Sequence, residues 1–304
     1  MSRPVQIVSS ALAGILALAL APALAAAQPA PSFAYGKADE LKDVEKVEWS
    51  ATAEAGLVVT TGNSRTTTIS GGAKATRKEK QNKFSGEASA TFARASTTVI
   101  AAGADNVLSA DEVTRDSATA AQAYNLKLRY DRFLTQWDSL YGAALAGADV
   151  IAGKDFVGGG QLGYARIVYK AEKHEVNLEA GYDFSYEDLA DGSSNNIHSG
   201  RAFLGYKGKL GAETSADGSL EVLVNGNRQS DEVGPAEDTR ATAVAALSTK
   251  LTKGIALSLS VTAKYDAAPA PFNPPAGVTL DPTDPPENSM LDTTTKASLI
   301  ITLL

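Results

Sequence analysis

Apolar and polar residues alternate with a period of two along most of the chain after Val47. Successive side chains of a β-strand leave opposite faces, so this period predicts strands. In residues 175–187 the even positions are apolar, whereas the odd positions include Glu179, Asp183 and Glu187. The same alternation recurs in residues 83–94, 123–131 and 255–264.

Extending this pattern predicts an all-β chain of about twelve strands. Their approximate ranges are 47–59, 65–76, 82–95, 117–132, 136–149, 157–170, 174–187, 196–210, 218–228, 239–252, 254–266 and 292–304. Most are longer than the usual strand of a soluble sheet and match the roughly nine to eleven residues that cross a bilayer at a tilt. Strand length therefore favours a transmembrane antiparallel up-and-down β-barrel.

The predicted connections alternate between short and long. The short ones are 77–81, 133–135, 171–173, 211–217 and the surroundings of Lys253; the long ones are 96–116, 150–156, 188–195, 229–238 and 267–291, and residues 60–64 form a tight turn. Bacterial barrels have short periplasmic turns and longer extracellular loops. The alternation thus predicts that both chain ends lie on the periplasmic side.

Charge distinguishes a membrane barrel from a soluble one, because a membrane barrel turns its apolar face to lipid and its polar face inward. The charges on the polar faces here exceed what a sealed protein core could hold unpaired. The residues predicted to line a polar lumen are Lys127, Arg129, Arg166, Glu179, Asp183, Arg201 and Lys207.

In the sixth predicted strand both faces are half apolar, so the alternation does not orient it. An arginine facing lipid at the bilayer midplane costs roughly 2 to 4 kcal/mol. We therefore predict that Arg166 faces the lumen, and that Ala165, Ile167 and Tyr169 face lipid. The same reasoning places Lys296 inside.

The first 27 residues resemble a secretory signal peptide, with Arg3, an apolar run and small residues ending at Ala27. An uncleaved membrane anchor is the alternative, since this stretch is long enough to span a bilayer. Residues 28–46 are predicted to be a periplasmic segment with a short helix, and residues 47–304 to be the barrel. We expect export through this cleavable signal to the bacterial outer membrane.

Composition narrows the function. A formal net charge of −7 without a basic patch argues against nucleic-acid binding. The absence of cysteine excludes disulfides, zinc–thiolate sites and thiol nucleophiles. The predicted outer loops are acidic and the periplasmic turns basic, which suggests divalent bridges to lipopolysaccharide at the outer mouth. We expect a monomer that contacts outer-membrane lipid, lipopolysaccharide and the barrel assembly machinery, without a cofactor or metal.

Two segments resemble a known family. Two stretches are similar to the YdiY-like family of salt-induced outer-membrane proteins, which is defined by a domain of unknown function. They are residues 49–92, which include WSATAEAGLVVTTGNSRTTTISGGAKA, and the tail LSLSVTAKYDAAPAP with LDTTTKASLIITLL. The resemblance implies an outer-membrane barrel and supplies no reaction or catalytic residue.

Catalytic and metal sites are not predicted. Asn196, His198 and Ser199 invite comparison with barrel phospholipases, but His198 and Ser199 are adjacent and so point to opposite faces of a strand. His174 lies in a charged turn with Glu172 and Glu175, which is more typical of a solvated turn than of a metal site. Gly158–Gly160 precede a strand rather than a helix and so form no phosphate cradle.

Three functional hypotheses remain open. The first is a narrow passive channel for small solutes. The second is a non-conducting structural envelope protein with a role in osmotic or salt stress. The third is a secreted soluble β-sandwich that binds a ligand. The expectation that the chain is not an enzyme is common to all three.

Overall fold

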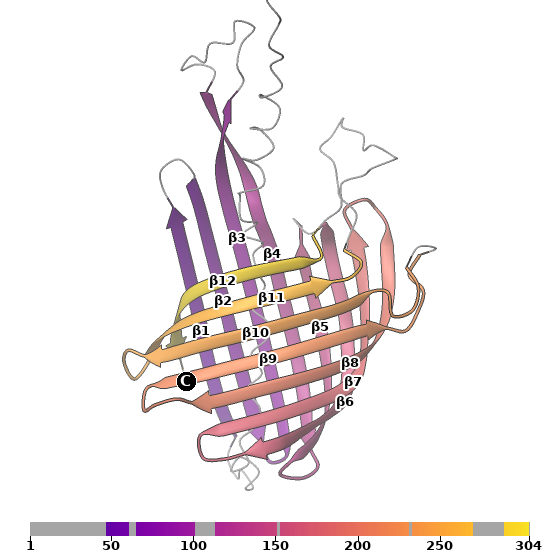
Figure 1. Cartoon of the computed structure of the whole chain (residues 1–304). Helices are drawn as coiled ribbons and strands as arrows, with labels where there is room; N and C mark the ends of the chain where they lie inside the picture. Colours follow the sequence, from indigo (N-terminus) through magenta and orange to yellow (C-terminus); the bar gives the residue numbers. More distant parts are fainter. Residues whose placement is uncertain are drawn as a thin grey trace, which may run out of the picture.

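The computed structural model describes residues 47–60, 65–100, 113–150, 153–230, 233–269 and 289–303, which form a closed barrel of twelve antiparallel strands (Figure 1). The strands are β1 (Glu48–Thr60), β2 (Arg65–Glu79), β3 (Asn82–Ile100), β4 (Val113–Phe133), β5 (Asp138–Asp149), β6 (Lys154–Lys170), β7 (His174–Leu189), β8 (Ser194–Lys209), β9 (Thr214–Asn225), β10 (Thr239–Lys250), β11 (Ile255–Asp266) and β12 (Leu291–Thr302). Each strand pairs with its neighbours in sequence, and β1 pairs with β12. The predicted up-and-down barrel is confirmed.

The predicted signal peptide and the segment 28–46 lie outside the described residues. Within the described ranges, no helix combines the length and the apolarity needed to cross a bilayer.

The connections partly follow the predicted alternation. At one end, which also carries Glu48 and Thr302, every connection has four residues or fewer, and we call this the short-turn end. At the opposite, long-loop end, the connections 150–153 and 190–193 are shorter than predicted, because β6, β7 and β8 extend further. The ninth strand is also displaced, since β9 begins at Thr214 rather than near residue 218.

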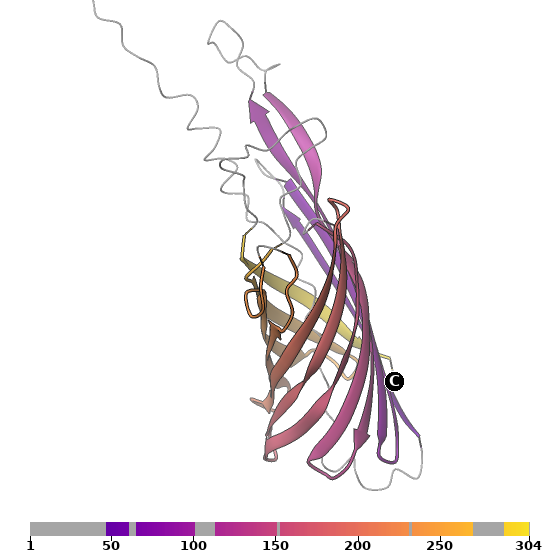
Figure 2. The same cartoon turned by 90° about the vertical axis from the view of Figure 1, so that its right-hand side faces the viewer.

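The β3–β4 hairpin projects beyond its neighbours at the long-loop end (Figures 1 and 2). Pairing between β4 and β5 stops at Ala123 and Asp149, whereas β3 and β4 remain paired as far as Ile100 and Val113. The upper part of the hairpin therefore extends past the closed wall.

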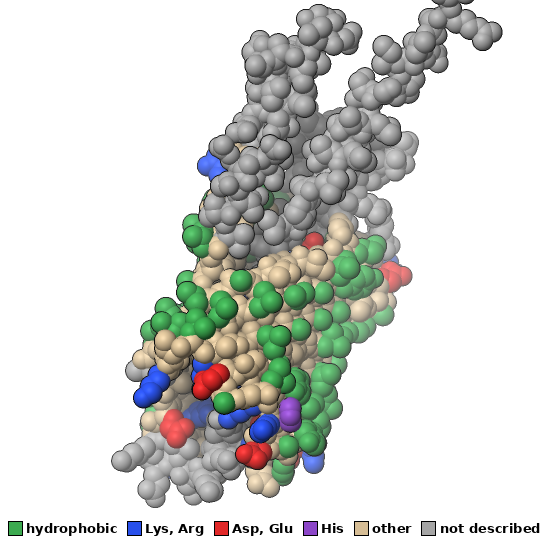
Figure 3. Space-filling model, turned by 60° about the vertical axis from the view of Figure 1, so that its left-hand side comes forward, with side chains coloured by type: hydrophobic (Ala, Val, Ile, Leu, Met, Phe, Trp, Pro, Cys, Tyr) green, Lys and Arg blue, Asp and Glu red, His purple; other side chains and the backbone are tan. Residues whose placement is uncertain are grey.

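Hydrophobic and polar residues are inverted relative to a soluble protein. On β4, Leu126 and Leu128 are exposed, whereas the alternate residues Lys127 and Arg129 are buried. Green hydrophobic side chains accordingly spread over the outer wall in Figure 3, and charged side chains gather toward its lower end. Soluble monomers rarely expose continuous apolar surface on this scale. The wall is therefore suited to lipid.

The prediction for β6 is wrong, because the structure orients this strand the opposite way. Ala165 and Ile167 are buried inside, whereas Arg166 is exposed on the outer wall, with 56% of its side chain accessible. A bulge between Ile167 and Tyr169 shifts the register and turns Tyr169 outward. Arg166 escapes the midplane penalty because it lies near the short-turn end, directly opposite Asp138, the first residue of β5.

The seam that closes the barrel is short. β1 pairs with β2 along its whole length but with β12 over only four residue pairs, from Thr52↔Thr302 to Ala55↔Leu299. Glu54 strengthens this seam from inside by binding Lys296 at 2.6 Å and by accepting a hydrogen bond from Ser298. Lys296 thus faces inward, as expected.

Candidate functional site

The barrel interior is the candidate site, and an acidic column on β7 organises it. Glu179, Asp183 and Glu187 occupy the inner face of this strand at four-residue intervals, and all three are buried. At about 3.3 Å per residue, neighbouring carboxylates start from backbone positions about 13 Å apart. Each carboxylate meets donors from other strands, so the column divides the interior into three levels.

The first level is a group of charges that we call the central network: Arg129 and Asp131 of β4, Glu179 of β7, Arg201 of β8 and Glu221 of β9. Arg129 lies 2.9 Å from Glu179 and donates Nη2–H to Asp131 at 2.6 Å. Arg201 donates Nη1–H to Glu179 and Nε–H to Glu221, both at 2.5 Å. The side chains of Glu179 and Arg201 are completely inaccessible.

Tyr141 of β5 supports both arginines of the central network. Its ring lies 4.1 Å from the guanidinium carbon of Arg129, within range for a cation–π interaction, and its hydroxyl accepts a hydrogen bond from Arg201 at 2.6 Å. Gly163 and Gly181 provide the space for this phenol. A Cβ atom on either glycine would approach the Tyr141 oxygen to 2.5 or 2.8 Å, respectively. The two glycines therefore shape the network without contributing charge.

The second level connects β4, β6 and β7 through one amide. Lys127 donates to Gln161 Oε1 at 3.1 Å, and Gln161 Nε2 donates to Asp183 at 2.8 Å. Ser185 donates a further hydrogen bond to Asp183 at 2.8 Å. The side-chain amide of Gln161 thus bridges the buried cation Lys127 and the buried anion Asp183.

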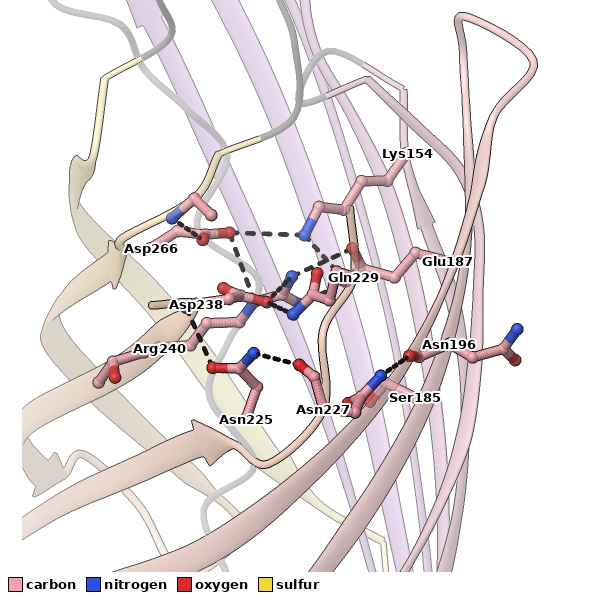
Figure 4. Close-up of polar contacts among 12 residues, drawn as sticks. Lys154, Ser185, Glu187, Asn196, Asn225, Asn227, Gln229, Asp238, Arg240 and Asp266 are labelled. Atoms are coloured by element: carbon pink, nitrogen blue, oxygen red, sulfur yellow. Dashed lines mark hydrogen bonds and ion pairs between the residues drawn. The ribbon is translucent and has the colours of Figure 1, made fainter. Parts of the chain in front are cut away.

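The third level, near the long-loop end, consists of charges that we name the outer latch (Figure 4): Lys154, Glu187, Asp238, Arg240 and Asp266. Lys154 Nζ lies 3.0 Å from Glu187 and 3.6 Å from Asp266. Arg240 binds Glu187, lies 2.8 Å from Asp238 and lies 3.7 Å from Asp266. Three carboxylates facing two cations give the latch a formal charge of −1.

The loop between β9 and β10 positions one anion of the outer latch. Asn225 accepts the backbone N–H of Asp238 at 3.0 Å and donates to the Gly234 carbonyl at 3.0 Å. Gln229 donates to the Asp238 carboxylate at 2.7 Å. The loop is thereby held against the interior, and Asp238 is buried.

The ion pairs on the inner faces of β1, β2, β3 and β12 are more accessible than Glu179 and Arg201. They are Glu54 with Lys296 and Lys74 with Glu87, and their side chains retain between 17% and 26% of their accessibility. Water therefore reaches charges on this side of the barrel, in contrast to Glu179 and Arg201 of the central network.

Most of the residues predicted to line the interior face inward. Lys127, Arg129, Glu179, Asp183 and Arg201 are buried there, and Lys207 shares the face of Arg201 and is half-buried. Arg166 is the exception, because it faces the outer wall. Sequence reasoning missed Tyr141, Glu221 and the outer latch. The alternation in residues 175–187 places Glu187 on the polar face. Lys154 and Asp238, however, fall in predicted loops, and no local sequence pattern indicates that they contact Glu187, Arg240 or Asp266.

The histidines are outside the interior. His198 is exposed and hydrogen-bonds Tyr182, whereas Ser199 is buried on the opposite face, so they form no nucleophile–base pair. His174 stacks on Tyr206, with ring centroids 6.1 Å apart. Among the described residues, no group of three or more potential ligands could hold a metal ion.

Comparison with known proteins identifies a family. The family model described as "Protein of unknown function, DUF481" matches residues 53–302. Similar solved structures include a NanC porin (8% identity, TM-score 0.41, 83% of this chain and 97% of that one). Others are the COG4313 outer membrane channel of Pseudomonas putida F1 (13%, 0.42, 84% and 95%) and the translocator domain of autotransporter NalP from Neisseria meningitidis (12%, 0.38, 88% and 92%). No curated protein matches the chain.

Proposed function

Because the chain belongs to the DUF481 family, whose function is unknown, we propose a role from the barrel itself: an integral outer-membrane protein whose interior is closed by ion pairs. In this role it is a structural component of the envelope rather than an open pore. A closed barrel with an apolar outer wall suits the outer membrane, where bacterial barrels of this kind reside.

The observation that carries this proposal is the reach of the outer latch across the interior. Lys154 begins β6 and Asp266 ends β11, five strands further around a barrel of twelve, yet their charged atoms lie 3.6 Å apart. Strands six apart would be diametrically opposite. In Figure 4 the charged atoms of Lys154 and Asp266 face each other directly, with Asp238 and Arg240 beside them, so the ion pairs span the mouth.

The central network supports the same conclusion at a deeper level. Arg129 on β4 and Glu179 on β7 are three strands apart and in contact. The wall of an open pore would be wet, whereas these two side chains are 3% and 0% accessible. A barrel of this size has room for a pore only where its interior charges do not meet.

A narrow passage for small solutes is the second candidate. It is favoured by the accessible charges on β1, β2, β3 and β12, of which Glu54 and Lys296 are examples. These side chains provide a wet strip beside the central network. In this second candidate function, breaking the ion pairs of the outer latch would open a polar path for small solutes.

Single-channel recording distinguishes the two candidates. The full chain is inserted into a planar bilayer, after a heat-modifiability gel has shown that it is folded. We expect no steady current from the wild-type protein. A steady, voltage-independent current from folded protein would contradict the closed barrel and support the passage.

Latch variants sharpen the test. Asp266→Asn and Arg240→Gln each remove one charge from the outer latch while the central network remains intact. We expect both variants to stay silent, because a second closed level lies beneath. Glu172→Gln, in a turn at the opposite end, is the matched control for the loss of one charge. Current from Asp266→Asn alone would show that the latch is the only barrier.

A further inference from the structure

Near the short-turn end, the outer wall carries Arg77, which is paired with Glu79, and two further arginines on either side of β5. Arg132 near the end of β4 and Arg166 of β6 are both exposed, and they flank β5. Tyr130, Asp138 and Tyr164 lie around them, and we call these five residues the rim patch.

The sheet register fixes the shape of the rim patch. Arg132 and Tyr164 are both paired with Leu140 of β5, and Arg166 is paired with Asp138 two residues nearer the short-turn end. Strands lie about 4.8 Å apart and residues about 3.3 Å apart along a strand, so the backbone positions of the two arginines are separated by about 12 Å. Two guanidinium groups thus border one shallow strip of the outer wall.

The rim patch has a formal charge of +1. Asp138 lies 3.2 Å from Arg166 and also accepts a hydrogen bond from Tyr164. Arg132 instead donates to a neutral acceptor, the Asn82 Oδ1 atom, at 2.8 Å, and Tyr130 donates to the same oxygen. The positive charge of Arg132 therefore remains available to an anion, and more than half of the Arg166 side chain is accessible.

We propose that the rim patch binds the phosphate of an anionic phospholipid in the periplasmic leaflet. The short-turn end is periplasmic by the general architecture of bacterial barrels. Guanidinium groups bind phosphate oxygens in a bidentate manner, and tyrosines prefer the headgroup level of a bilayer. This site is separate from the interior and is independent of whether the barrel conducts.

The surroundings indicate a lipid rather than a free anion. Leu140 and Leu162 lie next to the patch and are 50% and 65% exposed. They offer an apolar surface for an acyl chain whose phosphate rests on the arginines. Lipopolysaccharide would occupy the opposite leaflet, beyond the reach of these residues.

Native mass spectrometry of the full chain tests the proposal. The protein is equilibrated in mixed micelles that contain equimolar phosphatidylglycerol and phosphatidylcholine, and the ratio of the two in the first retained lipid is measured. A cation near an anionic lipid surface contributes about 1 kcal/mol, so a net charge of +1 predicts a preference of about fivefold for phosphatidylglycerol. Equal retention by the wild-type protein would overturn the proposal.

Two double variants locate the site. Arg132→Gln/Arg166→Gln should abolish the preference. Lys250→Gln/Lys253→Gln removes the same charge at the same end, at the exposed β10–β11 turn, and should preserve it. An equal loss in both variants would indicate a diffuse basic rim and refute the patch.

A gain-of-preference variant and a competition experiment complete the test. The variant keeps the proposal testable if the arginine variants do not fold, and the competition distinguishes a lipid from free phosphate. Asp138→Asn should raise the preference, because it removes the competing carboxylate; an unchanged ratio would count against the patch. Inorganic phosphate added at the concentration of the lipid should not displace it. Displacement would show a simple anion site and contradict lipid recognition.

Discussion

Replacing Arg129 with methionine tests whether the central network is dry. Arg129 donates from Nε and Nη2 to Asp131 and contacts Glu179 through Nη1. Methionine retains much of the side-chain volume but leaves Asp131 buried without this cation. The companion variant Arg129→Met/Asp131→Leu removes both charges together.

The expected loss in the free energy of unfolding depends on how deeply the ion pair is buried. Removing one partner of a buried ion pair costs about 3–5 kcal/mol, whereas an exposed pair is worth roughly 0–1 kcal/mol. The side chains of Arg129 and Asp131 are 3% and 5% accessible, so the larger figure applies. This corresponds to about a hundredfold to several-thousandfold increase in the unfolding equilibrium constant. Replacing both charges with apolar groups should restore part of the loss, because Asp131 is then no longer buried without Arg129, although the buried Lys83 opposite it loses a neighbouring carboxylate.

The free energy of unfolding is measured by denaturant titration in lipid vesicles, with the fluorescence of Trp49 and Trp137 as the signal. Folding is verified first on a heat-modifiability gel. Glu79→Gln serves as the control, because its pair with Arg77 is exposed. We expect this control to differ from the wild-type protein by no more than about 1 kcal/mol.

The reasoning would be refuted if Arg129→Met cost no more than the control. It would also be refuted if the double variant were no more stable than the single one. Either result would mean that water solvates Asp131 in the native barrel. The interior would then be wet at this level, in favour of a passage.

Three further predictions follow from the packing and the seam. Gly163→Ala should destabilise the barrel by about 1–3 kcal/mol, because the new Cβ would lie 2.6 Å from a backbone carbonyl oxygen, whereas Gly200→Ala has no atom within 4 Å and should be neutral in the same titration. In the cysteine-free chain, Ala53→Cys/Ile301→Cys should crosslink on a non-reducing gel, and folded protein without a crosslink would contradict closure between β1 and β12. Glu54→Gln should cost about 1 kcal/mol or less, since 26% of this side chain is accessible; a loss comparable to that of Arg129→Met would show that the seam is as dry as the central network.

Local alternation was sufficient to predict the number of strands, their approximate ranges and the inward face of most of them. In β4 and β7 one face is apolar and the other charged, so the sequence of each strand alone predicts which face points into the barrel. This is why Lys127, Arg129, Glu179 and Asp183 could be placed on one face before any pairing was known. A side chain needs only its own strand to select a face.

Contacts between strands required the tertiary structure. Both faces of β6 are half apolar, so its orientation came from pairing with β5, which places Arg166 opposite Asp138 on the outer wall. Likewise, no short-range pattern brings Lys154 to Asp266 or creates space for Tyr141 beside Gly163. These contacts depend on closure and on strand register, which determine the positions that meet across the interior. Register is a property of the whole sheet, and no single strand encodes it.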